Sequence, residues 1–114
     1  MSHSPIAMVE ADAYKGIEEG EVRMYLQLEG WTPTKLIHAP GDVYTSHKHP
    51  EEKLLVILAG SMRLRIGRDW TTLLPGDKAI IDGDVEHEAS MGKGGCTFFW
   101  AERMPEPSSD PSEK

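Results

Sequence analysis

The chain has 114 residues and a mass of 12.7 kDa, the size of a single domain. Its 12 Lys and Arg against 19 Asp and Glu give a formal net charge of −7, so it lacks the basic surface that nucleic acids and anionic membranes require. A single cysteine, Cys96, excludes an internal disulfide and fits a reducing compartment. Because no apolar run approaches the roughly 20 residues of a membrane span and residues 1–10 lack a signal-peptide pattern, we expect a cytoplasmic protein without membrane or nucleic-acid partners.

The two ends of the chain differ in composition from its middle. Residues 1–20 are predicted to form an N-terminal arm, with a single helical turn near residues 10–15 because Gly16 and Gly20 break any longer helix. Residues 104–114 are rich in proline and contain no branched aliphatic or aromatic side chain. Such a segment buries too little surface to offset its ordering entropy, so we expect a disordered C-terminal tail.

Between these ends, short apolar runs alternate with turn signals made of Gly, Pro and Asp. Apolar residues occupy every second position of residues 22–28, which predicts a half-buried strand. Residues 54–58 are apolar throughout, which predicts a strand covered on both faces that ends at Gly60. The glycine-rich residues 92–95 predict a turn. Further strands are predicted at residues 34–39, 62–66, 70–74, 78–81, 87–91 and 96–101. A total of about eight or nine short strands indicates an all-β sandwich or barrel.

Three of the five histidines have a pattern typical of a metal site. His47 and His49 are two residues apart, and positions i and i+2 of a strand point to the same face, so both rings can converge on one ion. His87 lies at the start of another predicted strand. Three neutral imidazoles with an open coordination position suit a divalent transition metal such as Zn, Fe, Ni, Mn or Cu.

The spacing around these histidines resembles the two sequence motifs of the cupin superfamily. Gly41 is followed by five residues, then by residues 47–49 and by a strand that ends in Gly60, as in the first motif. The Pro-Gly-Asp turn at residues 75–77 and the loop that leads to His87 are similar to the second motif. The resemblance implies an all-β, single-domain cupin double-stranded β-helix, also called a jelly-roll barrel.

The resemblance implies a barrel over residues 21–103 with a metal at its histidines, but the glutamate position of the first motif is here Lys53. Glu51 and Glu52 stand just before it. A regular strand would direct Glu51 toward the metal, whereas a one-residue shift in the turn after His49 would bring Glu52 inward, and the sequence leaves the choice open. The predicted metal set is His47, His49, His87 and, as the uncertain fourth member, Glu52.

The interior of such a barrel is expected to hold a small-molecule pocket. An ammonium group at Lys53 would bind a ligand carboxylate or repel the metal, but we favour an outward orientation in which Lys53 pairs with Glu51 or Glu52. Tyr44 lies three residues before His47, so on a regular strand it would face the opposite side. The predicted pocket residues are Lys53, Leu55, Ile57 and His38.

Three functional hypotheses follow. The first is a small metal-binding cupin that acts on a small molecule by oxygenase, isomerase or lyase chemistry, since the fold does not define the reaction. The alternative is a non-catalytic ligand-binding or regulatory module, with or without a metal, and the third is a metal-free barrel that acts through dimerisation. Whether the protein is an enzyme is therefore undecided. A homodimer is expected because edge strands need covering, with residues 22–28 and 98–100 as candidate surfaces. Cys96 is expected to be a small buried apolar side chain.

Overall fold

The computed structural model describes residues 7–47 and 50–103, and at Ala7, Ser46 and His47 it describes the backbone alone. One helix and seven strands follow in chain order: β1 (Ala7–Glu10), α1 (Glu19–Leu28), β2 (Thr34–His38), β3 (Val43–His47), β4 (Glu52–Ile66), β5 (Asp69–Leu73), β6 (Lys78–Ile81) and β7 (His87–Arg103). The predicted C-terminal tail lies outside the described residues.

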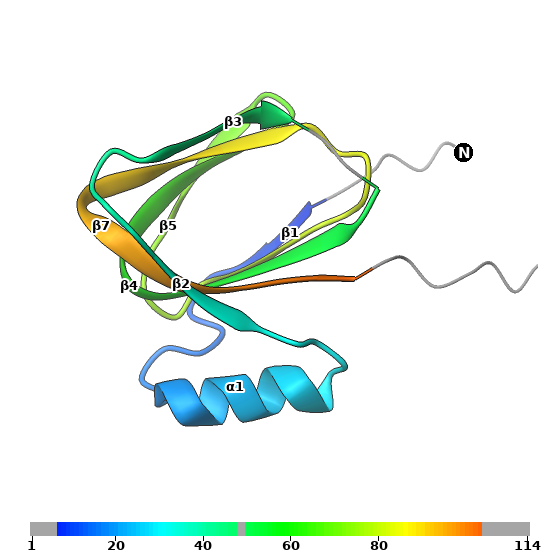
Figure 1. The fold of residues 1–114 in the computed structure, drawn as a ribbon, viewed down its shortest axis with the longest axis vertical. Coiled ribbons are helices and arrows are strands. Elements are labelled where there is room, and N and C mark those ends of the chain that lie inside the picture. Colours follow the sequence, from blue (N-terminus) through cyan, green and yellow to red (C-terminus); the bar gives the residue numbers. More distant parts are fainter. Residues whose placement is uncertain (1–6, 48–49, 104–114) are drawn as a thin grey trace, which may run out of the picture.

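The seven strands form one antiparallel sheet that curls around an interior, while α1 lies against its outside (Figure 1). The strand order is β1-β6-β4-β7-β2, with β3 paired to β7 and β5 paired to β4. This confirms the predicted all-β, jelly-roll architecture. In the described part of the chain, no helix is long and apolar enough to cross a bilayer.

The two central strands are longer than the sequence predicts. Turns were expected at Gly60 and at residues 92–95, but β4 and β7 each run through these positions without interruption. Gly60 and Gly95 have φ values of +79° and +77°, which glycine adopts without strain, and a Cβ atom at Gly60 would lie 2.2 Å from the carbonyl oxygen of Gly95. The prediction of two turns was wrong because these glycines bend a continuous strand pair instead of ending it.

The predicted strand at residues 22–28 is also wrong, because this segment belongs to α1. Val22 and Leu26 are one helical turn apart and are buried, whereas Met24 and Leu28 are exposed. The expected helical turn at residues 10–15 is likewise absent, because β1 ends at Glu10 and turns follow it. Alternating apolar residues over seven positions therefore do not distinguish a strand from a short helix with one buried face.

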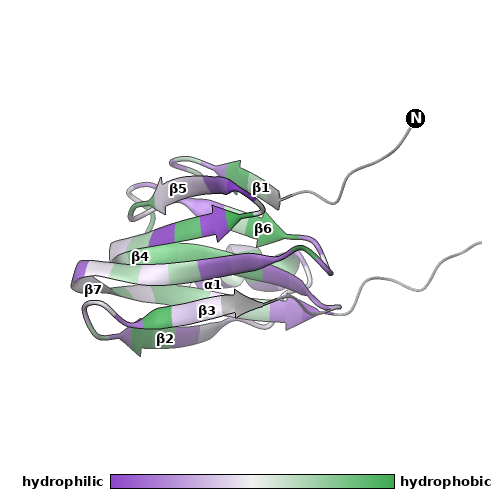
Figure 2. Cartoon of the chain, turned by 90° about the horizontal axis from the view of Figure 1, so that it is seen from above, coloured by the Kyte–Doolittle hydropathy of each residue, from purple (hydrophilic) through white to green (hydrophobic). Residues whose placement is uncertain are grey.

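Two apolar clusters lie on opposite sides of the β4–β7 pair. We call the cluster beneath α1 the outer core; its members are Val22, Leu26, Trp31, Leu54, Val56, Phe99 and Ala101. We call the cluster inside the barrel the inner core; its members are Leu55, Ile57, Met62, Leu64, Leu73, Ala79, Ile81, Val85, Ala89, Met91, Cys96 and Phe98. Hydrophobic and hydrophilic residues alternate along β4 (Figure 2). Met62 and Leu64 are buried in the inner core, whereas Arg63 between them is exposed. This alternation is that of a strand with one face in the core and the other outside it.

The two segments proposed as homodimer surfaces are each partly buried in this fold. Phe98 and Phe99 are fully buried within the chain, one in each core. On α1, Val22 and Leu26 are buried, whereas Met24 and Leu28 are exposed. Dimer formation stays a prediction, and of the two segments residues 22–28 still present exposed apolar side chains.

Candidate functional site

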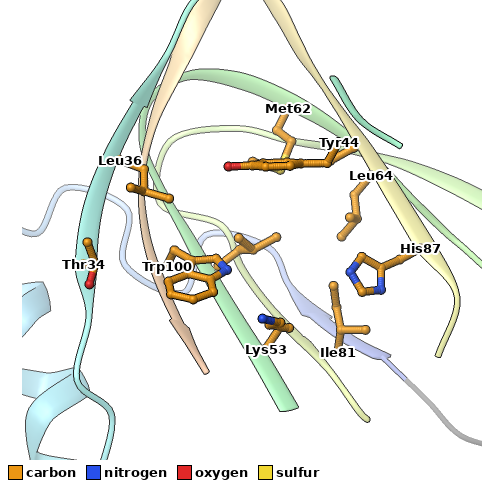
Figure 3. Close-up of a pocket in the computed structure, with 11 residues that line it drawn as sticks. Thr34, Leu36, Tyr44, Lys53, Met62, Leu64, Ile81, His87 and Trp100 are labelled. Atoms are coloured by element: carbon orange, nitrogen blue, oxygen red, sulfur yellow. The ribbon is translucent and has the colours of Figure 1, made fainter. Parts of the chain in front are cut away.

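A cavity of about 420 Å³ opens inside the barrel (Figure 3). Its wall is mainly apolar, with polar groups contributed by Thr34, Tyr44, Lys53 and His87. An apolar hollow with a few polar groups is the usual form of a small-molecule site. The lining residues are Thr34, Leu36, Tyr44, Lys53, Leu55, Met62, Leu64, Ile81, His87, Ala89 and Trp100.

His87 is the buried imidazole of this cavity wall, with 7% of its surface exposed. Its Nδ1 atom lies 2.8 Å from the carbonyl oxygen of Val85. A carbonyl oxygen only accepts hydrogen bonds, so Nδ1 carries the proton and donates it. In the neutral ring, Nε2 is then the atom that can accept a hydrogen bond or bind a metal.

Strand β3 pairs with β7 around an irregularity that positions Tyr44. Tyr44 pairs with Ala89 and His47 pairs with His87, so a step of three residues on β3 matches a step of two on β7. Such a β-bulge inserts one extra residue into the strand. The opposite facing expected of Tyr44 on a regular strand does not apply, because the strand is irregular here and Tyr44 lines the cavity.

The predicted metal set is only partly covered by the structure. His87 lines the cavity, and the backbone of His47 pairs with it. His49 lies outside the described residues. Among the residues whose side chains are described, 8–45 and 50–103, no group of three histidine, cysteine or acidic side chains is arranged to hold a metal ion.

The structure corrects the expected orientations of Glu52 and Lys53. The Arg103 Nε atom donates to Glu52 Oε1 over 3.0 Å, and Arg103 stacks 3.9 Å above the Trp31 ring of the outer core. The Glu52 carboxylate is thus paired on the outer side and does not line the cavity, which is opposite to the orientation that the predicted fourth ligand needs. Glu51, in the bend before β4, stays open as an alternative.

Lys53 points into the barrel instead of outward. Its ammonium forms an ion pair with Glu102, not with Glu51 or Glu52, and lies 4.6 Å from the centroid of the Trp100 ring. Glu102 is the residue directly opposite Lys53 on β7. The cavity therefore has a cation at the position where the first motif has a carboxylate, and that cation is already paired.

The other predicted pocket residues divide into three positions. Leu55 lines the cavity as expected, but Ile57 is 1% exposed in the inner core and does not line it. His38 lines a second, smaller cavity of about 160 Å³, which Tyr44 also borders. Trp100 lines the main cavity, although the sequence analysis placed it only in a candidate dimer surface. Its alternation with the buried Phe99 was the available signal.

Burial changes the ionisation of two groups near the interior. Burial, with a smaller contribution from the negative charge of Asp42, raises the pKa of Tyr44. The phenol is therefore protonated at neutral pH. Burial also raises the pKa of the Cys96 thiol to about 11, which agrees with its expected role as a buried apolar side chain.

Comparison with known proteins agrees with this architecture. Residues 35–102 match the cupin domain family, and no curated protein matches the chain. A cupin superfamily protein from Desulfitobacterium hafniense is 14% identical, with a TM-score of 0.60 over 92% of this chain and 84% of that chain. An RmlC-like cupin from Shewanella frigidimarina is 18% identical, with a TM-score of 0.58 over 67% of this chain and 68% of that chain.

A third structure, Bacillus subtilis oxalate decarboxylase, has Mn(II) centres. It is 18% identical, with a TM-score of 0.58 over 67% of this chain but only 22% of its own length. Identities this low show a common fold and carry no activity from one protein to the other. The family match, which covers more than half of the residues, goes further: this chain belongs to the cupin domain family.

Proposed function

We propose that this cupin binds a small, largely apolar molecule in the barrel cavity, next to a divalent transition metal held by His47, His49 and His87. The observation that carries the proposal is the state of His87: a buried imidazole on the wall of an apolar cavity, with its Nδ1 proton committed to a backbone carbonyl. Metal-binding histidines characteristically donate their second ring N–H to such an acceptor, which orients the other nitrogen toward the ion.

The donor set suits the proposed metal. Residues directly opposite one another in an antiparallel pair share a face of the sheet, so the pairing of His47 with His87 supports a common site. His49 joins them through its spacing from His47 along the chain. The ion pair between Lys53 and Glu102 offsets the positive charge that would otherwise oppose a cation in the cavity. A bound metal would supply a Lewis acid that polarises a ligand oxygen or lowers the pKa of a bound water.

The chain's own residues would select and orient the ligand. The aliphatic wall and Trp100 favour an apolar body, because burying it removes its surface from water. Lys53 provides a cation that a ligand carboxylate can approach when it competes with Glu102. These contacts are compatible with oxygenase, isomerase or lyase chemistry.

A second candidate, a ligand-binding or regulatory module without a metal, is favoured by one observation. The inward position on β4 that the first cupin motif gives to a glutamate belongs to Lys53, so the fourth protein ligand is replaced by a cation. In this case His87 would be a hydrogen-bonding group for the ligand.

Elemental analysis of protein purified without a metal-affinity tag tests the proposal. The wild type is expected to contain a stoichiometric metal, and His87→Ala is expected to lose most of it. His38→Ala, which removes a histidine outside the proposed set, and Glu52→Ala, which removes a carboxylate paired on the outer side, serve as matched controls and should retain it. Circular dichroism checks that each variant is folded.

Two results would argue against the metal site proposed at His47, His49 and His87. Equal metal content in the wild type and in His87→Ala would show that the bound metal lies elsewhere. A wild type that binds none of Zn, Mn, Ni or Fe after incubation would favour the metal-free module.

A further inference from the structure

A hydrogen-bonded chain of three side chains connects the cavity wall with the protein surface. The Tyr44 hydroxyl lies 2.6 Å from Nε2 of His38, and Nδ1 of His38 lies 3.3 Å from Oδ2 of Asp42. The same Asp42 oxygen accepts the backbone N–H of Ala39 at 3.0 Å. None of these residues belongs to the proposed metal set.

The surroundings hold the three groups in this arrangement. The His38 ring stacks on Phe98 of the inner core with a centroid distance of 5.6 Å and an interplanar angle of 13°. It also meets the edge of Tyr44 at 5.1 Å. The turn after β2 fixes Asp42 through its bond from Ala39. Tyr44 borders both the main cavity and the smaller cavity beside His38, so it separates the ligand space from the other two groups.

The positions of the protons follow from what each partner can do. A carboxylate only accepts, so Nδ1 of His38 carries the proton that points to Asp42. In the neutral ring Nε2 then has a lone pair, and the Tyr44 hydroxyl must donate to it. Burial and Asp42 raise the pKa of Tyr44, so the phenol keeps the proton that this arrangement requires. The Tyr44 oxygen is left with lone pairs only.

We propose that Tyr44 is a ligand-recognition residue that accepts a hydrogen bond from a hydroxyl or amine on the bound molecule. His38 sets this polarity by accepting the hydrogen bond of the phenol, and Asp42 holds His38 in the tautomer that can do so. Figure 3 shows the Tyr44 ring along the cavity wall with its oxygen toward the side of Leu36. The inference rests on the proposed binding of a small apolar molecule. It narrows that ligand to one that carries a hydrogen-bond donor on an apolar body.

Three probes of similar shape separate the possibilities: p-xylene has no polar group, p-cresol has a hydroxyl donor, and 4-methylbenzonitrile has an acceptor only. Dissociation constants are measured by NMR titration at pH 8, well above the range in which imidazole side chains ordinarily take up a proton. The ratio of p-cresol to p-xylene affinity is expected to fall about fivefold in Tyr44→Phe, the effect of one hydrogen bond.

Two variants test whether His38 controls the polarity of Tyr44. His38→Phe keeps a ring to stack on Phe98 but cannot accept a hydrogen bond from the phenol. The Tyr44 hydroxyl is then expected to donate into the cavity. The affinity for 4-methylbenzonitrile should therefore improve about fivefold relative to that for p-xylene. Ile37→Ala is the control. The Ile37 side chain is next to His38 on β2 but is exposed and lines neither cavity, so the wild-type preference should persist.

Each contrary result has a distinct meaning. If neither p-xylene nor p-cresol perturbs the resonances of Ala89 and Trp100, the cavity is not a ligand site, and both the proposed function and this inference fail. If both bind and Tyr44→Phe leaves their affinity ratio unchanged, the cavity binds ligands but Tyr44 does not recognise them. If Tyr44→Phe changes the ratio while His38→Phe does not improve nitrile binding, His38 does not set the polarity of Tyr44.

Discussion

The two faces of the β4–β7 pair are built from alternating residues of the same strands, yet α1 packs against one face and the larger cavity opens on the other. On the outer side, Leu54 and Val56 are fully buried beneath α1. On the inner side, Lys53 and Leu55 border the cavity of about 420 Å³. Neighbouring residues therefore differ in role: Leu54 is packed within the outer core, while Lys53 and Leu55 leave room for a ligand.

A pair of adjacent leucines turns this comparison into a stability measurement. Leu54→Ala should reduce the free energy of unfolding by about 4 kcal/mol, because it opens a new void in a closely packed cluster. Leu55→Ala removes the same atoms from the wall of an existing cavity and should cost about 2 kcal/mol. Urea denaturation of both variants provides the comparison. Equal losses would mean that the inner face is packed as tightly as the outer one.

The ion pairs at the end of the β4–β7 pair give a second contrast. The Lys53 side chain is only 11% exposed, so Glu102→Gln should leave a poorly solvated cation and cost about 1–2 kcal/mol. The Glu52–Arg103 pair is more exposed, at 27% and 44%, and Arg103 also rests on Trp31. Glu52→Gln should therefore cost less than about 0.5 kcal/mol. Thermal and urea unfolding measure the stability of both variants. A larger loss of stability for Glu52→Gln than for Glu102→Gln would contradict the assignment of Lys53 to the buried side and of Glu52 to the exposed side.

The helix that covers the outer face can be strengthened at Gly20. A Cβ atom there meets nothing within 4 Å and the residue is helical, so Gly20→Ala should stabilise the protein by about 0.5 kcal/mol. Gly16 offers the same open space but has a φ of +79°, so Gly16→Ala should destabilise by about 1 kcal/mol. If both substitutions changed the melting temperature in the same direction, the different backbone conformations of Gly20 and Gly16 would not determine the effect of an added Cβ atom.

The smallest expected effect is the thiol reactivity of Cys96, which reports how far the barrel cavity extends along the inner face. Cys96 belongs to the inner core but does not line the cavity. Because burial raises the pKa of its thiol to about 11, very little thiolate exists at pH 8. The native protein should not react with a disulfide reagent such as DTNB within an hour, whereas the protein in denaturant should react fully. Rapid labelling of the native state would show that the interior is open as far as Cys96.

Sequence patterns predicted the barrel because its signals are local. The spacing of His47, His49 and His87 and the turn at residues 75–77 resemble the cupin motifs, and the family match agrees. The helix was missed because Val22 and Leu26 fit both a period of two and a turn of 3.6 residues. Only packing against the outer core decides between them.

The candidate site was predicted less completely, since it depends on pairings between distant segments. Lys53 turns inward because β4 keeps a regular alternation from Lys53 to Leu55, and its partner Glu102 is 49 residues away in sequence. Glu52 is held on the outer side by Arg103, which no local pattern indicates. Tyr44 reaches the cavity only through the irregular pairing of β3 with β7.

That irregular pairing makes the length of β3 as important as its composition. Tyr44 and His47 are an odd number of residues apart in the sequence, but their partners Ala89 and His87 are an even number apart. Deleting one residue between them would restore a regular ladder, and either Tyr44 or position 47 would then exchange faces. A single-residue deletion at Thr45 or Ser46 should therefore abolish the site while leaving a foldable sheet.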